Sequence, residues 1–255
     1  MKNKITILGC GSSLGSPWIT GHKGNDSNNI KNIRTRCSAH IRYKNLSILI
    51  DTSPDIKMQF RVNKITDLDA VVYTHDHADQ TAGIFELRPF FWKNKKKIPV
   101  YGSKETIKLL MKNNTYCFKN IKGYQAILES KIIKNTFSIK KNNNSLTFKT
   151  FEAQHGQINS TVYVFKKIAY MSDCNFIEKK NYKDLKNLDV LIIDCLRKKK
   201  HPSHFNYEEA LRMSSLLKAK KTIFTNLHTD LDYSELKKEL PKNILPAYDG
   251  LTINF

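Results

Sequence analysis

The chain has 255 residues and a formal net charge of +20, from 43 Lys and Arg against 23 Asp and Glu. This length can bury a large core, and we expect one domain over residues 1–255, because no Pro-, Gly- or Ser-rich linker divides the sequence. The five cysteines contain no Cys-x-x-Cys pair, which argues against a disulfide framework, and no apolar run approaches the ~18 residues of a membrane helix. We therefore expect a cytoplasmic protein without a membrane partner.

The positive charge has two explanations. The lysines are dispersed and accompany many asparagines and isoleucines, a bias that an AT-rich coding sequence produces without selection for binding. A positive field would also concentrate anions at a cleft, which favours a small anionic substrate. A nucleic-acid partner stays open but is not favoured, because binding to phosphates usually needs clustered Lys and Arg.

The first elements are β-like. Residues 5–8 form an apolar strand that enters a glycine-bearing turn, whose spacing does not fit a dinucleotide-binding fingerprint. Residues 38–43 and 46–50 read as a hairpin around Lys44-Asn45. The second strand of this hairpin ends at Asp51, which the pairing would set beside the loop that comes next.

The most informative segment follows an apolar strand over residues 69–73 and reads Thr74-His75-Asp76-His77-Ala78-Asp79-Gln80. His75, His77 and Asp79 are spaced by two, so on a nearly extended chain their side chains leave the same side. A helix over residues 81–92 would follow. A His-x-His pair alone is often a solvated loop, but a strand before it and a carboxylate after it favour a metal site.

The same arrangement recurs downstream, where candidate ligands stand at strand ends. Residues 98–102 predict a strand and 104–111 a helix, and later strands over 145–153, 161–165, 168–171, 190–193 and 222–225 lead to polar residues, with a helix over 207–218. The residues at these ends are His155, Asp173, Asp194, Asn226 and His228. Strand ends gather along one edge of a sheet, so we expect these side chains to converge.

The chain resembles the metallo-β-lactamase superfamily, whose signature is His-x-His-x-Asp-His after a strand. The resemblance covers nearly the whole chain and implies the αββα fold, an α/β sandwich of two mixed sheets with helices outside. Four further motifs resemble the subgroup of cyclic-phosphate phosphodiesterases of phosphonate catabolism. They are Gly9-Cys10-Gly11-Ser12-Ser13, Arg36-Cys37-Ser38, Leu49-Ile50-Asp51-Thr52 and Leu87-Arg88-Pro89.

The resemblance implies a metal centre. Its first site would be formed by His75, His77 and His155, and three histidines leave one position open, as in catalytic zinc sites. Asp173 matches the carboxylate that bridges two metals. Asp79 and His228 would complete the second site, with the ligand at His228 displaced by two residues from the position of Asn226.

Gln80 departs from the signature, which has a third histidine there. A glutamine oxygen is a poor zinc ligand, so the second site is in doubt. We expect Zn²⁺ or Mn²⁺, with one or two ions per chain. Of the catalytic candidates, His204 resembles a histidine that phosphodiesterases of the superfamily hold beside the scissile phosphate. Two alternatives are that His204 is only a solvated residue, or that His201 takes this role. Asp79 would orient the attacking water if it is not fully engaged as a ligand.

The expected function is a metal-dependent hydrolase, most specifically a phosphodiesterase acting on a small phosphodiester such as a cyclic phosphate. A divalent ion lowers the pKa of bound water from about 15.7 toward about 7, which supplies hydroxide at neutral pH. One alternative is an endonuclease that processes transfer-RNA 3′ ends, although no long inserted RNA-binding arm is visible. An alternative of another class is a non-catalytic binding protein with a degenerate second site. A homodimer stays open.

Overall fold

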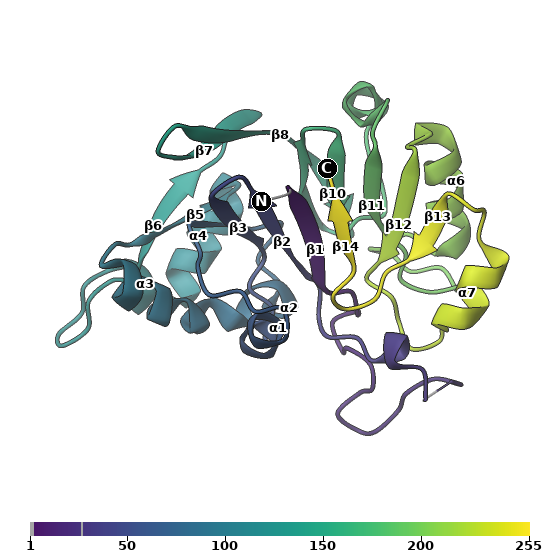
Figure 1. Ribbon diagram of the computed structural model, residues 1–255, viewed down its shortest axis with the longest axis horizontal. Helices are drawn as coiled ribbons and strands as arrows, with labels where there is room; N and C mark the ends of the chain where they lie inside the picture. Colours follow the sequence, from purple (N-terminus) through teal and green to yellow (C-terminus); the bar gives the residue numbers. More distant parts are fainter. Residues whose placement is uncertain (1–2, 27) are drawn as a thin grey trace.

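The computed structural model describes residues 3–26 and 28–255. Within these ranges the strands form two seven-stranded sheets that pack face to face (Figure 1). In spatial order the first sheet consists of β14 (Thr252–Asn254), β1 (Lys4–Gly9), β2 (Ser38–Tyr43), β3 (Leu46–Ile50), β4 (Ala70–Val72), β5 (Ile98–Gly102) and β6 (Leu128–Ile132). The second consists of β13 (Ile244–Pro246), β12 (Lys221–Thr225), β11 (Val190–Asp194), β10 (Ile168–Met171), β9 (Ile158–Phe165), β8 (Asn144–His155) and β7 (Thr136–Lys141).

Both sheets are mixed, and their parallel halves determine where the site lies. Strands β3 to β6 are parallel, as are β10 to β13, whereas the remaining neighbours are antiparallel. Carboxyl ends of parallel strands meet at one edge of a sheet, where α/β proteins place their chemistry. Asp51 follows β3, His75 lies beyond β4, Asp173 follows β10, Asp194 ends β11 and Asn226 follows β12.

Helices cover the outer face of each sheet. Figure 1 shows α1 to α4 on the side of the first sheet and α6 and α7 on the side of the second. One buried apolar cluster fills the space between the sheets, and one further cluster lies between each sheet and its helices. The α-helices are α1 (Ile56–Val62), α2 (Ala78–Thr81), α3 (Arg88–Asn94), α4 (Lys104–Asn113), α5 (Thr115–Phe118), α6 (Tyr207–Leu217) and α7 (Tyr233–Glu239). The 3-10 helices are η1 (Ile30–Asn32), η2 (Ala82–Leu87) and η3 (Lys179–Leu185). The expected αββα sandwich is confirmed.

The hairpin of β2 and β3 is confirmed, with Ala39 opposite Ile50 and Tyr43 opposite Leu46. The helix expected over residues 81–92 is instead three short helices, α2, η2 and α3. Pro89 lies in the first turn of α3. Backbone N–H groups in the first turn have no partner within the helix, so proline, which lacks this group, is tolerated there and a new helix begins. Among the described residues, no helix has both the length and the apolar character to cross a membrane.

Candidate metal centre

His75 is held by a hydrogen-bonded series that begins at Asp51. The carboxylate of Asp51 accepts from the backbone N–H of Thr74 at 2.7 Å and from its hydroxyl at 2.8 Å. Since the Thr74 hydroxyl donates to Asp51, its oxygen accepts from Nδ1–H of His75, 3.0 Å away. This leaves the lone pair of His75 on Nε2, a buried atom with no hydrogen-bond partner among the described residues. A buried nitrogen with an unused lone pair fits a metal ion.

His155, the last residue of β8, is oriented in the same way. Its Nδ1 donates to the backbone carbonyl of Ser203 at 2.7 Å, so its Nε2 carries the lone pair. That Nε2 lies 3.3 Å from Nδ1 of His77. Gly156 follows with a φ of 62°, a left-handed conformation that ends the strand and that glycine adopts without strain.

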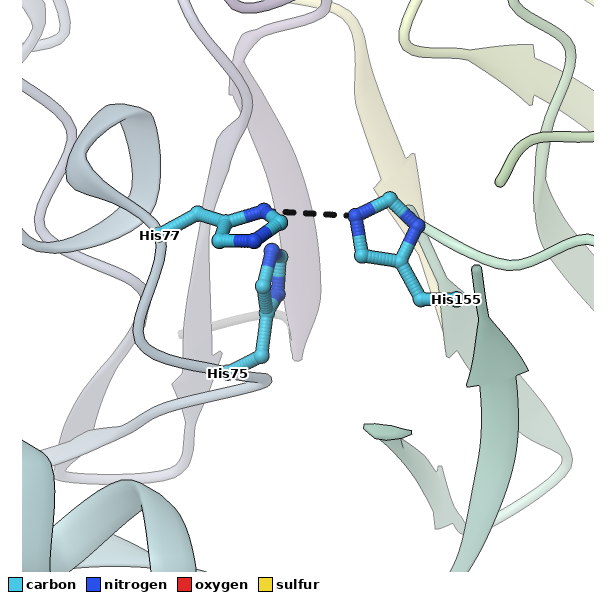
Figure 2. A group of neighbouring side chains, drawn as sticks. All are labelled: His75, His77 and His155. Atoms are coloured by element: carbon cyan, nitrogen blue, oxygen red, sulfur yellow. Dashed lines mark hydrogen bonds between the residues drawn. The ribbon is translucent and has the colours of Figure 1, made fainter. Parts of the chain in front are cut away.

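The three imidazoles converge from two sheets, as Figure 2 shows: His75 and His77 come from the loop after β4, and His155 from the end of β8. Their ring centroids are 4.6 to 5.0 Å apart. One potential ligand atom from each lies within 4.8 Å of the others. Three nitrogen donors with an open fourth position match catalytic zinc sites, so this cluster fits a divalent ion.

Burial keeps two of these imidazoles neutral, the form that binds metals. It lowers the pKa of His75 to about 3 and also lowers the pKa of His155. His77 lies on the exposed side of the cluster. The centre is therefore buried on the side of His75 and His155 and open to solvent on the side of His77.

A second group shares His155 and adds Asp173 and His204, with potential ligand atoms again within 4.8 Å of one another. Burial alone would raise the pKa of Asp173, but the imidazoles of His75, His204 and His155 hold it below its usual value. The ring of His204 lies 4.6 Å from that of His155, and its Nδ1 lies 2.7 Å from Oδ2 of Asp194. Burial would lower the pKa of His204, whereas the Asp194 carboxylate raises it to about 9.

Asp79 and Gln80 lie beside this second group. The amide nitrogen of Gln80 donates to Oδ2 of Asp79 at 3.1 Å and to Oδ2 of Asp173 at 3.5 Å. Its oxygen, Oε1, is buried and has no partner among the described residues. Asp79 and Asp173 are thus joined through the Gln80 amide, at the position where the sequence signature has a third histidine.

The structure does not bring His228 to either group, which corrects the expectation that it completes a second site. Nδ1 of His228 lies 2.7 Å from Oδ1 of Asp230, and its ring meets that of Trp18 at 5.5 Å. The expectation assumed an extended segment on which positions 226 and 228 share a side. Asn226 has a φ of 63°, so the chain turns there and the two-residue alternation fails.

Asn226 itself lies at the site, with its amide nitrogen 3.1 Å from Oδ1 of Asp173. Asp194 was not assigned a role from the sequence, yet it holds His204 and accepts from the backbone N–H of Cys174 at 2.9 Å. Asp194 ends β11 and Asn226 directly follows β12, two largely buried strands, and this position is the signal that could have identified them. The role of Thr74 depends on its hydroxyl geometry, which the sequence pattern does not encode.

Comparisons with known proteins agree with this geometry. The family model described as "Beta-lactamase superfamily domain" matches residues 47–226. Among curated proteins, the chain is similar to an octanoyltransferase of Porphyromonas gingivalis (strain ATCC BAA-308 / W83), with 29% identity over 254 residues. That match covers 97% of this chain and 51% of the relative, so the chain spans about half the length of that protein.

Two solved structures extend the comparison. A diphosphatase described as belonging to the PhnP family is 31% identical, with a TM-score of 0.91, over 100% of this chain and 98% of that one. The short form of human tRNase Z shares the fold, with a TM-score of 0.70 and 17% identity over 98% of each chain. Because the family model covers more than half of the chain and includes both histidine-bearing segments, the chain belongs to the beta-lactamase superfamily.

Proposed function

We propose that the chain is a metal-dependent phosphodiesterase that hydrolyses a small anionic phosphodiester. The observation that carries this proposal is the convergence of His75, His77 and His155 beside a second group that contains Asp173 and His204. The similarity to a PhnP-family diphosphatase over the full chain favours chemistry at phosphorus. The net charge of +20 supports an anionic substrate through its field.

The roles follow from the geometry. His75, His77 and His155 would hold a divalent ion such as Zn²⁺ or Mn²⁺. When bound, this ion polarises a phosphoryl oxygen and makes water a stronger nucleophile at neutral pH. His204, which contacts Asp194, would donate a proton to the leaving oxygen. Asp79 lies at the edge of the centre and would orient the attacking water.

A nucleic-acid substrate is the second candidate, and a lysine-rich groove favours it. This groove of about 700 Å³ is lined by residues of β8, β9 and η3 and by the segment after β6. The backbone N–H of Thr161 in its wall donates to the carbonyl of Thr74, next to the metal loop. The charged residues that line it are Lys104, Lys134, Lys149, Lys180 and Lys183, with Glu152, Glu178 and Asp184. Binding of RNA whose affinity falls steeply as salt rises would favour this candidate.

The experiment that tests the proposal measures hydrolysis of bis-para-nitrophenyl phosphate and of a cyclic nucleotide with Zn²⁺ or Mn²⁺ added. We expect turnover that chelation abolishes and metal restores. His155→Ala should abolish it, whereas His22→Ala, a matched change in the exposed loop, should retain it. Absence of turnover on every phosphodiester tried, with metal bound, would contradict the phosphodiesterase and favour a binding protein.

A further inference from the structure

Two side-chain amides lie where a second ion would have to bind. Gln80 and Asn226 are buried, at 0% and 1% exposure, and each directs its nitrogen at one oxygen of Asp173. Gln80 Nε2 is 3.5 Å from Oδ2, and Asn226 Nδ2 is 3.1 Å from Oδ1. The carboxylate of Asp173 is thus held from both sides by N–H donors.

The orientation of the Asn226 amide is fixed by the main chain. Its Nδ2 donates to the backbone carbonyl of Ser172 at 3.1 Å, and a carbonyl oxygen can only accept. Turning the amide over would place its Oδ1 against the carbonyl oxygen of Ser172. Asn226 therefore presents hydrogens, not lone pairs, to Asp173 and cannot bind a cation at that position.

Gln80 is constrained at its backbone. Its N–H donates to the carbonyl of His77 at 3.0 Å, and its carbonyl accepts from the N–H of Thr52 at 2.8 Å. With Nε2 also 3.1 Å from Asp79, the NH₂ group bridges two carboxylates. An ion between Asp79 and Asp173 would have to displace this group and turn Oε1 inward.

We propose that the amides of Gln80 and Asn226 replace the second metal, so that the centre holds one ion on the histidine cluster. The N–H groups give Asp79 and Asp173 the positive partners that a second cation would otherwise supply. This inference rests on the proposed function, since it concerns how many ions the same centre uses. It explains why positions 80 and 226 present amide nitrogens to Asp173 in place of metal-binding imidazoles.

Metal stoichiometry tests the inference without reference to activity. Purified protein is dialysed against Zn²⁺ and, separately, Mn²⁺, and bound metal is measured by elemental analysis and calorimetric titration. We expect one tight ion per chain in the wild type and two in Gln80→His/Asn226→His. Histidine tolerates the left-handed backbone at position 226 better than most residues.

The matched control is Gln125→His/Asn254→His, which makes the same amide-to-imidazole changes on the exposed surface and should retain one ion. Thermal unfolding shows whether each variant is folded. Two tight ions in the wild type would overturn this inference and leave the proposed function standing. One ion in a folded Gln80→His/Asn226→His variant would also overturn it, because the amides would not then be what excludes the second ion. No tight ion in the wild type would overturn the proposed function.

Discussion

Nδ1 of His204 lies 2.7 Å from Oδ2 of Asp194, the last residue of the fully buried strand β11. Asp194 is itself fully buried, and its carboxylate also accepts from the N–H of Cys174. A buried carboxylate with a fixed position holds the imidazole in one orientation beside His155. This contact distinguishes His204 from the neighbouring His201, whose Nδ1 lies 3.1 Å from the hydroxyl of Ser203.

Replacing His204 should impair turnover more than replacing His201. We expect His204→Ala to lower kcat about 10²- to 10⁴-fold, the usual loss when a general acid is removed, with metal content unchanged. His201→Ala should have a much smaller effect, because His201 contacts Ser203 and not the carboxylate. Steady-state kinetics on bis-para-nitrophenyl phosphate measures both, and equal losses would contradict the assignment.

Asp194 should act through His204. Asp194→Asn is expected to lower kcat less than His204→Ala does. The double variant should be no slower than His204→Ala alone, because the carboxylate has no role once the imidazole is gone. Independent, multiplying losses in this double-mutant cycle would show that Asp194 contributes by another route.

Thr74 should control metal affinity. Thr74→Val keeps the shape of the side chain but removes the hydroxyl between Asp51 and His75. We expect the divalent ion to bind about 10- to 100-fold more weakly, the usual effect of losing a group that orients a metal-binding histidine. Competition with a chelator measures the affinity. Thr147→Val, the same change on an exposed strand position, should leave it unaltered.

His40 should make folding sensitive to acid. Burial lowers its pKa to about 3, and its Nε2 donates to the Ser47 hydroxyl, which in turn donates to the carbonyl of Asp67. In the unfolded chain His40 is protonated as the pH falls through about 6.5, whereas in the folded chain it stays neutral until about pH 3. The stability that this difference provides above pH 6.5 is therefore lost as the pH falls toward 3.

Between pH 8 and pH 5 the loss from His40 amounts to about 2 kcal/mol in the free energy of unfolding. His40→Gln keeps a donor near the position of Nε2 and cannot ionise. Between pH 8 and pH 5 the free energy of unfolding of this variant should therefore fall by about 2 kcal/mol less than that of the wild type. Urea unfolding at the two pH values provides the measurement. An identical pH dependence in both proteins would mean that His40 is protonated in the folded state.

Much of the fold and the site could be predicted from the sequence because the strands are short apolar runs that end at polar residues. His75, His77 and His155 follow from this pattern, as does the approach of Asp173 and His204. The short strands β13 and β14, of three residues each, carry too little periodicity to detect.

The residues that surround Asp173 could not be predicted from the sequence pattern, for a different reason. Asn226 leaves the extended conformation, so counting alternate residues selected His228, which the structure places against Asp230 and Trp18. The pairing of the two amides with Asp173 depends on side-chain orientation, which no local pattern specifies.

The central claim is that His75, His77 and His155 bind one divalent ion together. Anomalous scattering from crystals grown with Zn²⁺ or Mn²⁺ and measured at the metal edge tests it most directly. We predict one strong peak within coordination distance of all three imidazoles. A map without that peak, or with the metal held elsewhere in the chain, would contradict the account.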